Sequence, residues 1–97
     1  MTYEFHPEAQ AEHLETVAYY ETQQAGLGAS YLAEFESVLD MACESPNRYP
    51  IEGEPEIRRI KLIRFPYTVL FRESDGTIQV LAVAHHRRRP LYWLGRL

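Results

Sequence analysis

Residues 68–85 read TVLFRESDGTIQVLAVAH and predict two adjacent strands joined by a tight turn. The segments 68–72 and 77–85 are rich in β-branched and other apolar residues, a composition typical of strands. The pair Asp75-Gly76 between them is a strong turn signal, so the two strands should form a hairpin. The run VLAVA at 80–84 is apolar at consecutive positions, which predicts a strand that is buried on both faces inside the sheet.

A third strand is predicted just upstream, over residues 58–65. Ile60 and Leu62 fall on one face of this segment, whereas Arg59, Lys61 and Ile63 fall on the other, as expected for a half-buried strand. The segment before it, residues 46–56, contains three prolines and a glycine and is predicted to be a loop. At the other end of the chain, residues 3–6 alternate and predict a short strand.

Two helices are predicted between the first strand and this loop. Pro7 suits the first turn of a helix that we expect to extend to about residue 25. Its helically spaced apolar residues are Ala11, Leu14 and Ala18. The segment Gly26-Leu27-Gly28 ends it, and a second helix stops before Pro46. The apolar residues of the second helix form a cleaner stripe of Tyr31, Leu32, Phe35, Val38, Leu39 and Ala42. So short a linker predicts an antiparallel helix hairpin.

The predicted order of elements is β-α-α-β-β-β, followed by a short tail from residue 90 that has room for one or two helical turns. This order predicts an α+β fold in which the helix hairpin packs on a small, mainly antiparallel sheet. A length of 97 residues is typical of one domain, so residues 1–97 are expected to form a single domain.

The charges are divided sharply along the chain. Residues 1–56 contain twelve acidic residues and one basic residue, whereas residues 57–97 contain nine basic and two acidic residues. The net charge of −4 makes the chain a poor general binder of nucleic acid. A basic face could still bind a polyanion locally, or the two halves could neutralise each other within the fold.

Several function classes are disfavoured by what the sequence lacks. Cys43 is the single cysteine, so no intrachain disulfide can form, and we expect an inert thiol beside the core. No apolar run approaches the roughly 20 residues of a membrane span, and the N-terminus lacks the pattern of a signal peptide. His85 and His86 have no further His or Cys cluster near them in the sequence. We therefore expect a cytoplasmic protein without membrane contact, metal or cofactor.

Several short motifs occur along the chain: FHPEA at 5–9, AYYE at 18–21, GLG at 26–28, SPNRYP at 45–50, IRR at 57–59, RFPY at 64–67 and VAHHRRRPLYW at 83–93. Together with the order of the elements, these motifs resemble the RelE/ParE superfamily, the toxins of type II toxin–antitoxin systems. The resemblance covers essentially the whole chain, and its end is similar to that of many plasmid-stabilisation proteins.

The resemblance implies a growth-inhibiting toxin and a cognate antitoxin that wraps its surface, with a toxin–antitoxin hetero-oligomer as one possible assembly. It leaves the target open, because ParE-like members inhibit DNA gyrase, whereas RelE-like members cut mRNA on the ribosome. A third possibility is a module that binds an antitoxin but has lost toxicity. The acidic balance of the chain favours the ParE-like function, since a ribonuclease needs a dense basic footprint.

The resemblance also assigns candidate residues for RNA cleavage. Cleavage through the 2′-hydroxyl needs a proton acceptor, a group that stabilises the phosphate and a proton donor. Arg59 and Lys61 fall on the family's strand lysines, and Tyr92 falls on its late tyrosine, which could stack on a base. His86 stands where RelE has an arginine, and Thr68 stands where another catalytic arginine would be. If the chain is RelE-like, its catalytic residues are Lys61, His86 and Tyr92.

A binding toxin would use overlapping residues as interface anchors. These target-binding candidates are Arg59, Arg87, Arg88, Arg89 and Trp93. The alternatives are a solvated sheet edge for Arg59 and Lys61, ion pairs with the acidic half for the arginine run, and a tail anchor for Tyr92 and Trp93. Three tyrosines near the helix hairpin are expected in the core, with antitoxin contact as the alternative: Tyr19, Tyr20 and Tyr31.

Overall fold

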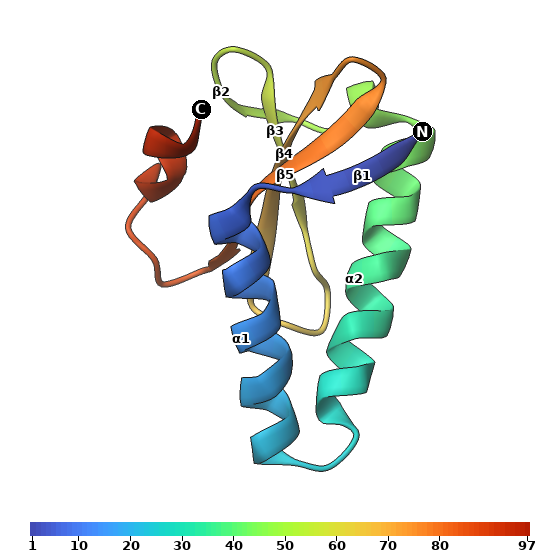
Figure 1. The fold of residues 1–97 in the computed structure, drawn as a ribbon, viewed down its shortest axis with the longest axis vertical. Coiled ribbons are helices and arrows are strands. Elements are labelled where there is room, and N and C mark those ends of the chain that lie inside the picture. The colour runs from blue at the N-terminus through green and yellow to red at the C-terminus, as the bar shows by residue number, and fades with distance from the viewer.

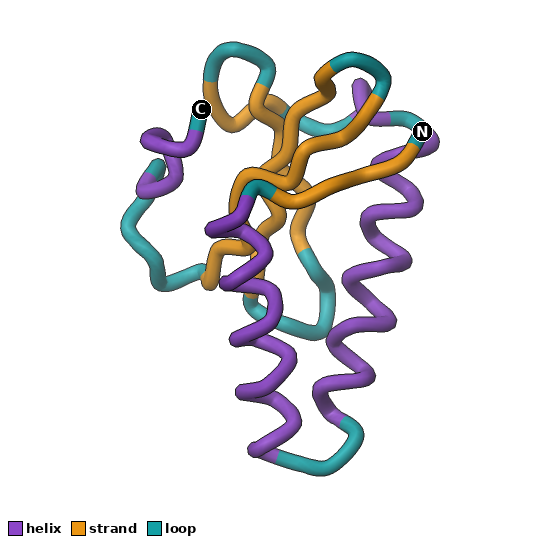
Figure 2. Tube along the Cα trace, in the orientation of Figure 1, coloured by secondary structure: helices purple, strands orange, loops and turns teal.

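The computed structural model describes residues 1–97 as a five-stranded sheet with two long helices on one face and a short C-terminal helix on the other (Figure 1). The elements in chain order are β1 (Thr2–Phe5), α1 (Pro7–Gln23), α2 (Leu27–Glu44), the 3₁₀ turn η1 (Pro46–Arg48), β2 (Ile51–Gly53), β3 (Ile57–Lys61), β4 (Tyr67–Ser74), β5 (Thr77–His85) and the 3₁₀ helix η2 (Tyr92–Arg96). Figure 2 separates the helical layer from the strands. The predicted α+β architecture with a helix hairpin and a short tail is confirmed.

The sheet has the order β1-β5-β4-β3-β2, and only the β1–β5 pair is parallel. β5 therefore lies inside the sheet, as its apolar run predicts. The β4–β5 ladder pairs Phe71 with Val80 and Leu70 with Ala82, which leaves Leu81 as the extra residue of a β-bulge. Because of this bulge, Leu81 and Ala82 both pack on the face opposite the long helices.

The predicted loop over residues 46–56 is wrong in part, because residues 51–53 form the edge strand β2. Ile51 pairs with Arg58, and Gly53 pairs with Ile57 across a register shift. A strand of three residues is too short to show an alternating pattern, and Pro50 beside it signals a break. The predicted strand over 58–65 ends earlier than expected, at Lys61, because the chain turns toward β4.

The larger core lies between the helices and the sheet. Five of the six residues of the predicted α2 stripe pack there and are at most 5% exposed: Tyr31, Phe35, Val38, Leu39 and Ala42. The sixth, Leu32, is only partly buried. Opposite them are residues of β4 and β5, among them Val69, Phe71, Ile78 and Val80.

The predicted apolar face of α1 is wrong. Leu14 is 59% exposed, and Ala11 and Ala18 also face solvent. The residues that α1 buries are Ala9, His13 and Thr16. The two polar ones have satisfied partners, because His13 Nδ1 lies 3.1 Å from the Tyr31 hydroxyl and Thr16 Oγ1 donates to the Glu12 carbonyl. Hydrogen-bonded polar groups can be buried at little cost.

Burial among aromatic rings lowers the pKa of His13 below its usual value of 6.5. The folded state therefore favours the neutral imidazole, and protonation is easier in the unfolded chain. We expect the free energy of unfolding to fall as the pH drops below about 6.5, and to stop falling once His13 is charged in both states. Urea unfolding at pH 7.5 and pH 5.5 measures this loss.

His13→Gln is the matched variant, because it removes the titrating group and keeps a polar side chain. It should reduce the difference in unfolding free energy between the two pH values. The pKa values of Glu12 and Glu34 are lowered, so protonation of these carboxylates affects stability only below about pH 4.5. It does not contribute between pH 5.5 and pH 7.5. Equal stability of the wild-type chain at pH 7.5 and pH 5.5 would contradict the prediction.

Candidate functional site

An open hollow of about 520 Å³ lies on the sheet face opposite the long helices, between the strands and the C-terminal segment. Its lining residues are Glu52, Arg59, Lys61, Thr68, Leu70, Ala84, His85, His86, Arg88, Arg89, Pro90, Leu91, Tyr92 and Trp93. We call this site the basic hollow, because it has four Lys or Arg residues and a single carboxylate. It brings together every candidate residue from the sequence except Arg87.

Strand register explains how Arg59 and Lys61 of β3 reach this hollow. Lys61 pairs with Thr68 on β4, and Thr68 pairs in turn with Ala84 on β5. Residues paired across strands point to the same face. The small side chains of Thr68 and Ala84 leave space between Lys61 and the segment that follows β5. The position where the resemblance implies a catalytic arginine is thus part of the floor of the hollow.

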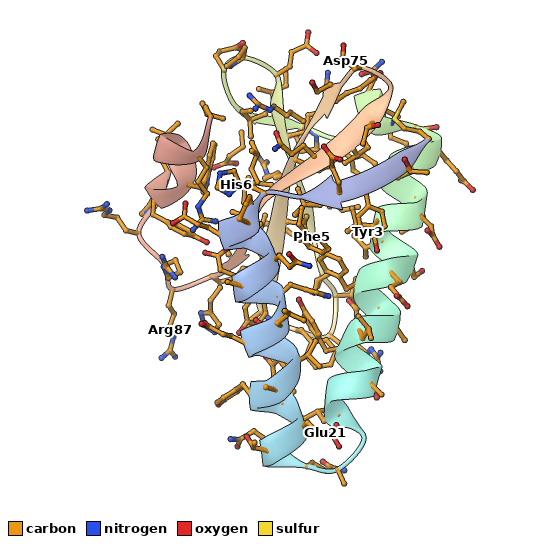
Figure 3. The ribbon with its side chains drawn as sticks, viewed as in Figure 1. Tyr3, Phe5, His6, Glu21, Asp75 and Arg87 are labelled. Atoms are coloured by element: carbon orange, nitrogen blue, oxygen red, sulfur yellow. The ribbon has the colours of Figure 1, made fainter.

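The turn after β5 directs the side chains of the three consecutive arginines, residues 87–89, to different places. The Arg87 amide donates to His85 Nδ1 at 3.0 Å, and the Arg88 amide donates to the His85 carbonyl at 2.9 Å. The His86 amide donates to the Pro66 carbonyl. Figure 3 shows Arg87 pointing away from the fold, whereas Arg88 and Arg89 line the hollow.

The cations of the hollow differ in how far they are neutralised. Arg59 forms an ion pair with Glu52 at 2.8 Å, and both side chains are about one third exposed. Lys61 and Arg89 are exposed and have no carboxylate within 4 Å. The positive charge available to a partner therefore comes chiefly from Lys61 and from the arginines after β5.

Tyr92 is held within the protein by both its hydroxyl and its ring. The hydroxyl donates to Glu12 Oε2 at 2.7 Å. The Arg88 guanidinium carbon lies 3.8 Å from the ring centroid, and that of Arg96 lies 5.1 Å away. Burial, together with the Glu12 carboxylate, raises the pKa of Tyr92 well above its usual value. Tyr92 therefore stays protonated at neutral pH, and Arg88 covers one face of its ring.

Trp93 is buried rather than presented to solvent. It is 3% exposed and packs in a small cluster with Ile57, Leu70, Leu81 and Ala82. A Cβ atom at Gly53 would lie only 3.3 Å from Trp93 Cη2, so glycine lets β2 pass close to the indole. This packing fits the tail-anchor alternative of the sequence analysis.

Two residues that hold Tyr92 from behind the hollow, Glu12 and Arg96, were not found from the sequence. The Arg96 guanidinium binds the Glu12 carboxylate through two nitrogens, at 2.9 and 2.8 Å. Hydrogen bonds from Arg96, the Val83 amide and Tyr92 outweigh the effect of burial and lower the pKa of Glu12. The one signal in the sequence was the acidic first half and basic second half, which this pair joins in the fold.

Comparison with known proteins assigns the family. Residues 3–90 match the family model described as the ParE toxin of the type II toxin–antitoxin system parDE. The chain belongs to the ParE toxin family. Its fold is also similar to a solved structure entitled "Chromosomal ParDE TA system from P. aeruginosa", with a TM-score of 0.75, 18% identity, and coverage of 88% of this chain and 95% of that chain. No curated protein sequence matches the chain.

Membership of the ParE toxin family confirms the predicted toxin of a type II toxin–antitoxin system and implies an antitoxin partner.

Within this ParE-family chain, Tyr31 is fully buried and Tyr20 packs beside it, which confirms core packing for both. Tyr19 differs, because it is 56% exposed. Cys43 packs against the helix-side core, and burial raises the pKa of its thiol.

Two further observations concern ligands and membranes. No three His, Cys, Asp or Glu side chains of this ParE-family chain are grouped so that they could hold a metal ion. None of its helices has the length and apolar character needed to span a lipid bilayer.

Proposed function

We propose that the chain arrests bacterial growth by binding DNA gyrase through the basic hollow, without catalysing a reaction. The observation that carries this proposal is the state of Tyr92, whose hydroxyl is bonded to Glu12 while Arg88 covers its ring. A ribonuclease would need this side chain for the scissile RNA, either as a stacking platform or as a proton carrier. Here both uses require breaking contacts within the protein.

The remaining candidates for RNA cleavage are also incomplete. Arg59 is paired with Glu52 at 2.8 Å, and threonine occupies position 68 in place of a basic residue. Lys61 and His86 are the two exposed candidates that remain. Two side chains alone do not supply the proton acceptor, the proton donor and the group that stabilises the phosphate, all of which this reaction needs. The RelE-like alternative is therefore less well supported than a binding function.

The lining of the hollow indicates the chemistry of the bound segment. Lys61 and Arg89 supply unpaired positive charge, and Pro90 and Leu91 supply exposed apolar surface. A protein segment with carboxylates and a few apolar side chains complements such a surface, because charge pairing gives specificity and apolar contact gives affinity. We propose that gyrase presents an acidic, partly apolar segment to this hollow.

The antitoxin is proposed to use the opposite kind of surface. The helix hairpin has no Lys or Arg between residues 7 and 44. It exposes Leu14 and Tyr19 on α1, close to the acidic Glu15. A basic amphipathic segment of the antitoxin fits this face.

Charge reversal in the basic hollow tests the target. The wild-type chain should inhibit DNA supercoiling by purified gyrase, and Lys61→Glu combined with Arg89→Glu should raise the half-inhibitory concentration by at least about tenfold. Arg48→Glu is the matched control, because Arg48 is exposed on η1, outside the hollow, and it should inhibit as the wild type does. Circular dichroism checks that each variant is folded.

A parallel assay on translating ribosomes separates the two functions. A gyrase inhibitor leaves the mRNA intact, and single substitutions in its hollow give graded losses. A ribonuclease would cut the mRNA and would lose activity abruptly with His86→Ala or Tyr92→Phe. Cleavage of mRNA without inhibition of supercoiling would overturn the proposal.

A further inference from the structure

Glu12 lies at the centre of a network that joins α1, β5 and the C-terminal helix η2. Its side chain is 14% exposed, and that of its partner Arg96 is 9% exposed. A carboxylate so far removed from water is stable only where its charge and its lone pairs are satisfied. Glu12 meets this condition, although it does not line the basic hollow.

Each oxygen of the Glu12 carboxylate has two donors. Oε1 accepts from the Val83 amide and from Arg96 Nη1, both at 2.9 Å. Oε2 accepts from the Tyr92 hydroxyl at 2.7 Å and from Arg96 Nη2 at 2.8 Å. Arg96 Nη1 also donates to the carbonyl of Leu81, the bulged residue of β5, so the network is anchored to the sheet at two points.

The network extends to the hollow through Tyr92 and Arg88. The bond from Glu12 fixes where the Tyr92 ring stands, and the Arg88 guanidinium carbon lies 3.8 Å from the centre of that ring. Arg88 Nη1 is also 4.0 Å from Glu12 Oε2, while half of the Arg88 side chain remains exposed. The position of an exposed, target-facing charge is thereby set by a carboxylate beneath it.

We infer that Glu12 is a positioning residue for the basic hollow. Glu12 holds Tyr92 and η2 in place, and Tyr92 in turn keeps Arg88 oriented toward the target. The inference rests on the proposed binding function of this hollow. It assigns Glu12 an effect on target binding that acts through Tyr92 and Arg88, without contact between Glu12 and the target.

Glu12→Gln is the sharpest variant, because it keeps the size of the side chain and removes one acceptor. Whichever way the amide is oriented, its NH₂ group faces a nitrogen of Arg96, and a guanidinium nitrogen cannot accept a hydrogen bond. The variant must therefore lose at least part of the Tyr92, Val83 or Arg96 contacts. Arg96→Lys is a second variant, because it keeps the charge but loses the two-nitrogen contact.

The first experiment measures supercoiling inhibition in a double-mutant cycle of the full chain. Glu12→Gln should raise the half-inhibitory concentration about tenfold in the wild-type background, which corresponds to roughly 1.4 kcal/mol. It should add little in an Arg88→Ala background, because residues that act in one network are not additive. A role in global stability alone would give the same loss in both backgrounds. Glu36→Gln, an exposed residue of α2 without a bonded partner, is the control and should inhibit like the wild type.

The second readout does not depend on the target. Trp93 is the single tryptophan and is the residue of η2 that is buried against the sheet, so its quenching by acrylamide reports whether the tail stays docked. Quenching should increase in Glu12→Gln and Arg96→Lys at temperatures where circular dichroism shows folded protein, and it should not change in Glu36→Gln. If the wild-type chain fails to inhibit gyrase, the proposed function fails, while this readout still tests the positioning role.

Two results would overturn the inference. One is a folded Glu12→Gln chain with wild-type inhibition and wild-type Trp93 quenching. The other is an equal loss of inhibition with and without Arg88. If Glu12→Gln does not fold, Arg96→Lys decides by the same two measurements.

Discussion

Replacing Trp93 with alanine should lower the free energy of unfolding by about 3 kcal/mol and the melting temperature by roughly 15 °C. The indole is 3% exposed and is the largest member of the five-residue cluster on the second face of the sheet. Removing it leaves a cavity against Leu70 and Leu81, which are held in the sheet and cannot collapse into the space. Urea unfolding followed by circular dichroism measures the effect.

Leu94→Ala is the matched control, because Leu94 lies in the same 3₁₀ helix and is 45% exposed. Its effect should stay within about 0.5 kcal/mol. A loss for Trp93→Ala as small as that for Leu94→Ala would mean that the tail is not docked in solution. The undocking of the tail should also weaken toxicity, because η2 forms one wall of the basic hollow.

The sequence predicted α2 well and the facing of α1 poorly for the same physical reason. Positions of α2 that face the core hold only apolar or aromatic side chains, so the spacing of Phe35, Val38 and Leu39 indicates the buried face directly. α1 buries His13 and Thr16 instead. Their polar groups are satisfied by partners that are remote in sequence or belong to the backbone, and a hydrophobicity pattern contains no information about such partners.

The candidate site was likewise predicted in part: its basic residues were found from the sequence, but the residues that hold them in place were not. Alternation along β3 placed Arg59 and Lys61 on one face, and the register of the hairpin then brought them near the residues after β5. The ion pair behind the site could not be predicted, because Glu12 and Arg96 are 84 positions apart in the sequence. Many acidic residues of the first half could pair with many basic residues of the second, and the packing of the tail selects one pair.

Gly28→Ala should destabilise the chain by about 1–3 kcal/mol, although alanine ordinarily stabilises a helix by up to about 1 kcal/mol relative to glycine. A Cβ atom at Gly28 would lie 2.7 Å from the Val17 carbonyl oxygen, which is backbone and cannot rotate away. The helices cannot separate easily at this point, because the Glu21 carboxylate binds the amides of Gly26 and Gly28 at 2.9 and 3.1 Å, at the hairpin turn seen in Figure 3. Gly95→Ala is the control, since nothing lies within 4 Å of the added carbon, and urea unfolding compares the two. A Gly28→Ala chain as stable as the wild type would show that α1 and α2 can move apart at no cost, and the close approach of the helix pair would then contribute nothing to the fold.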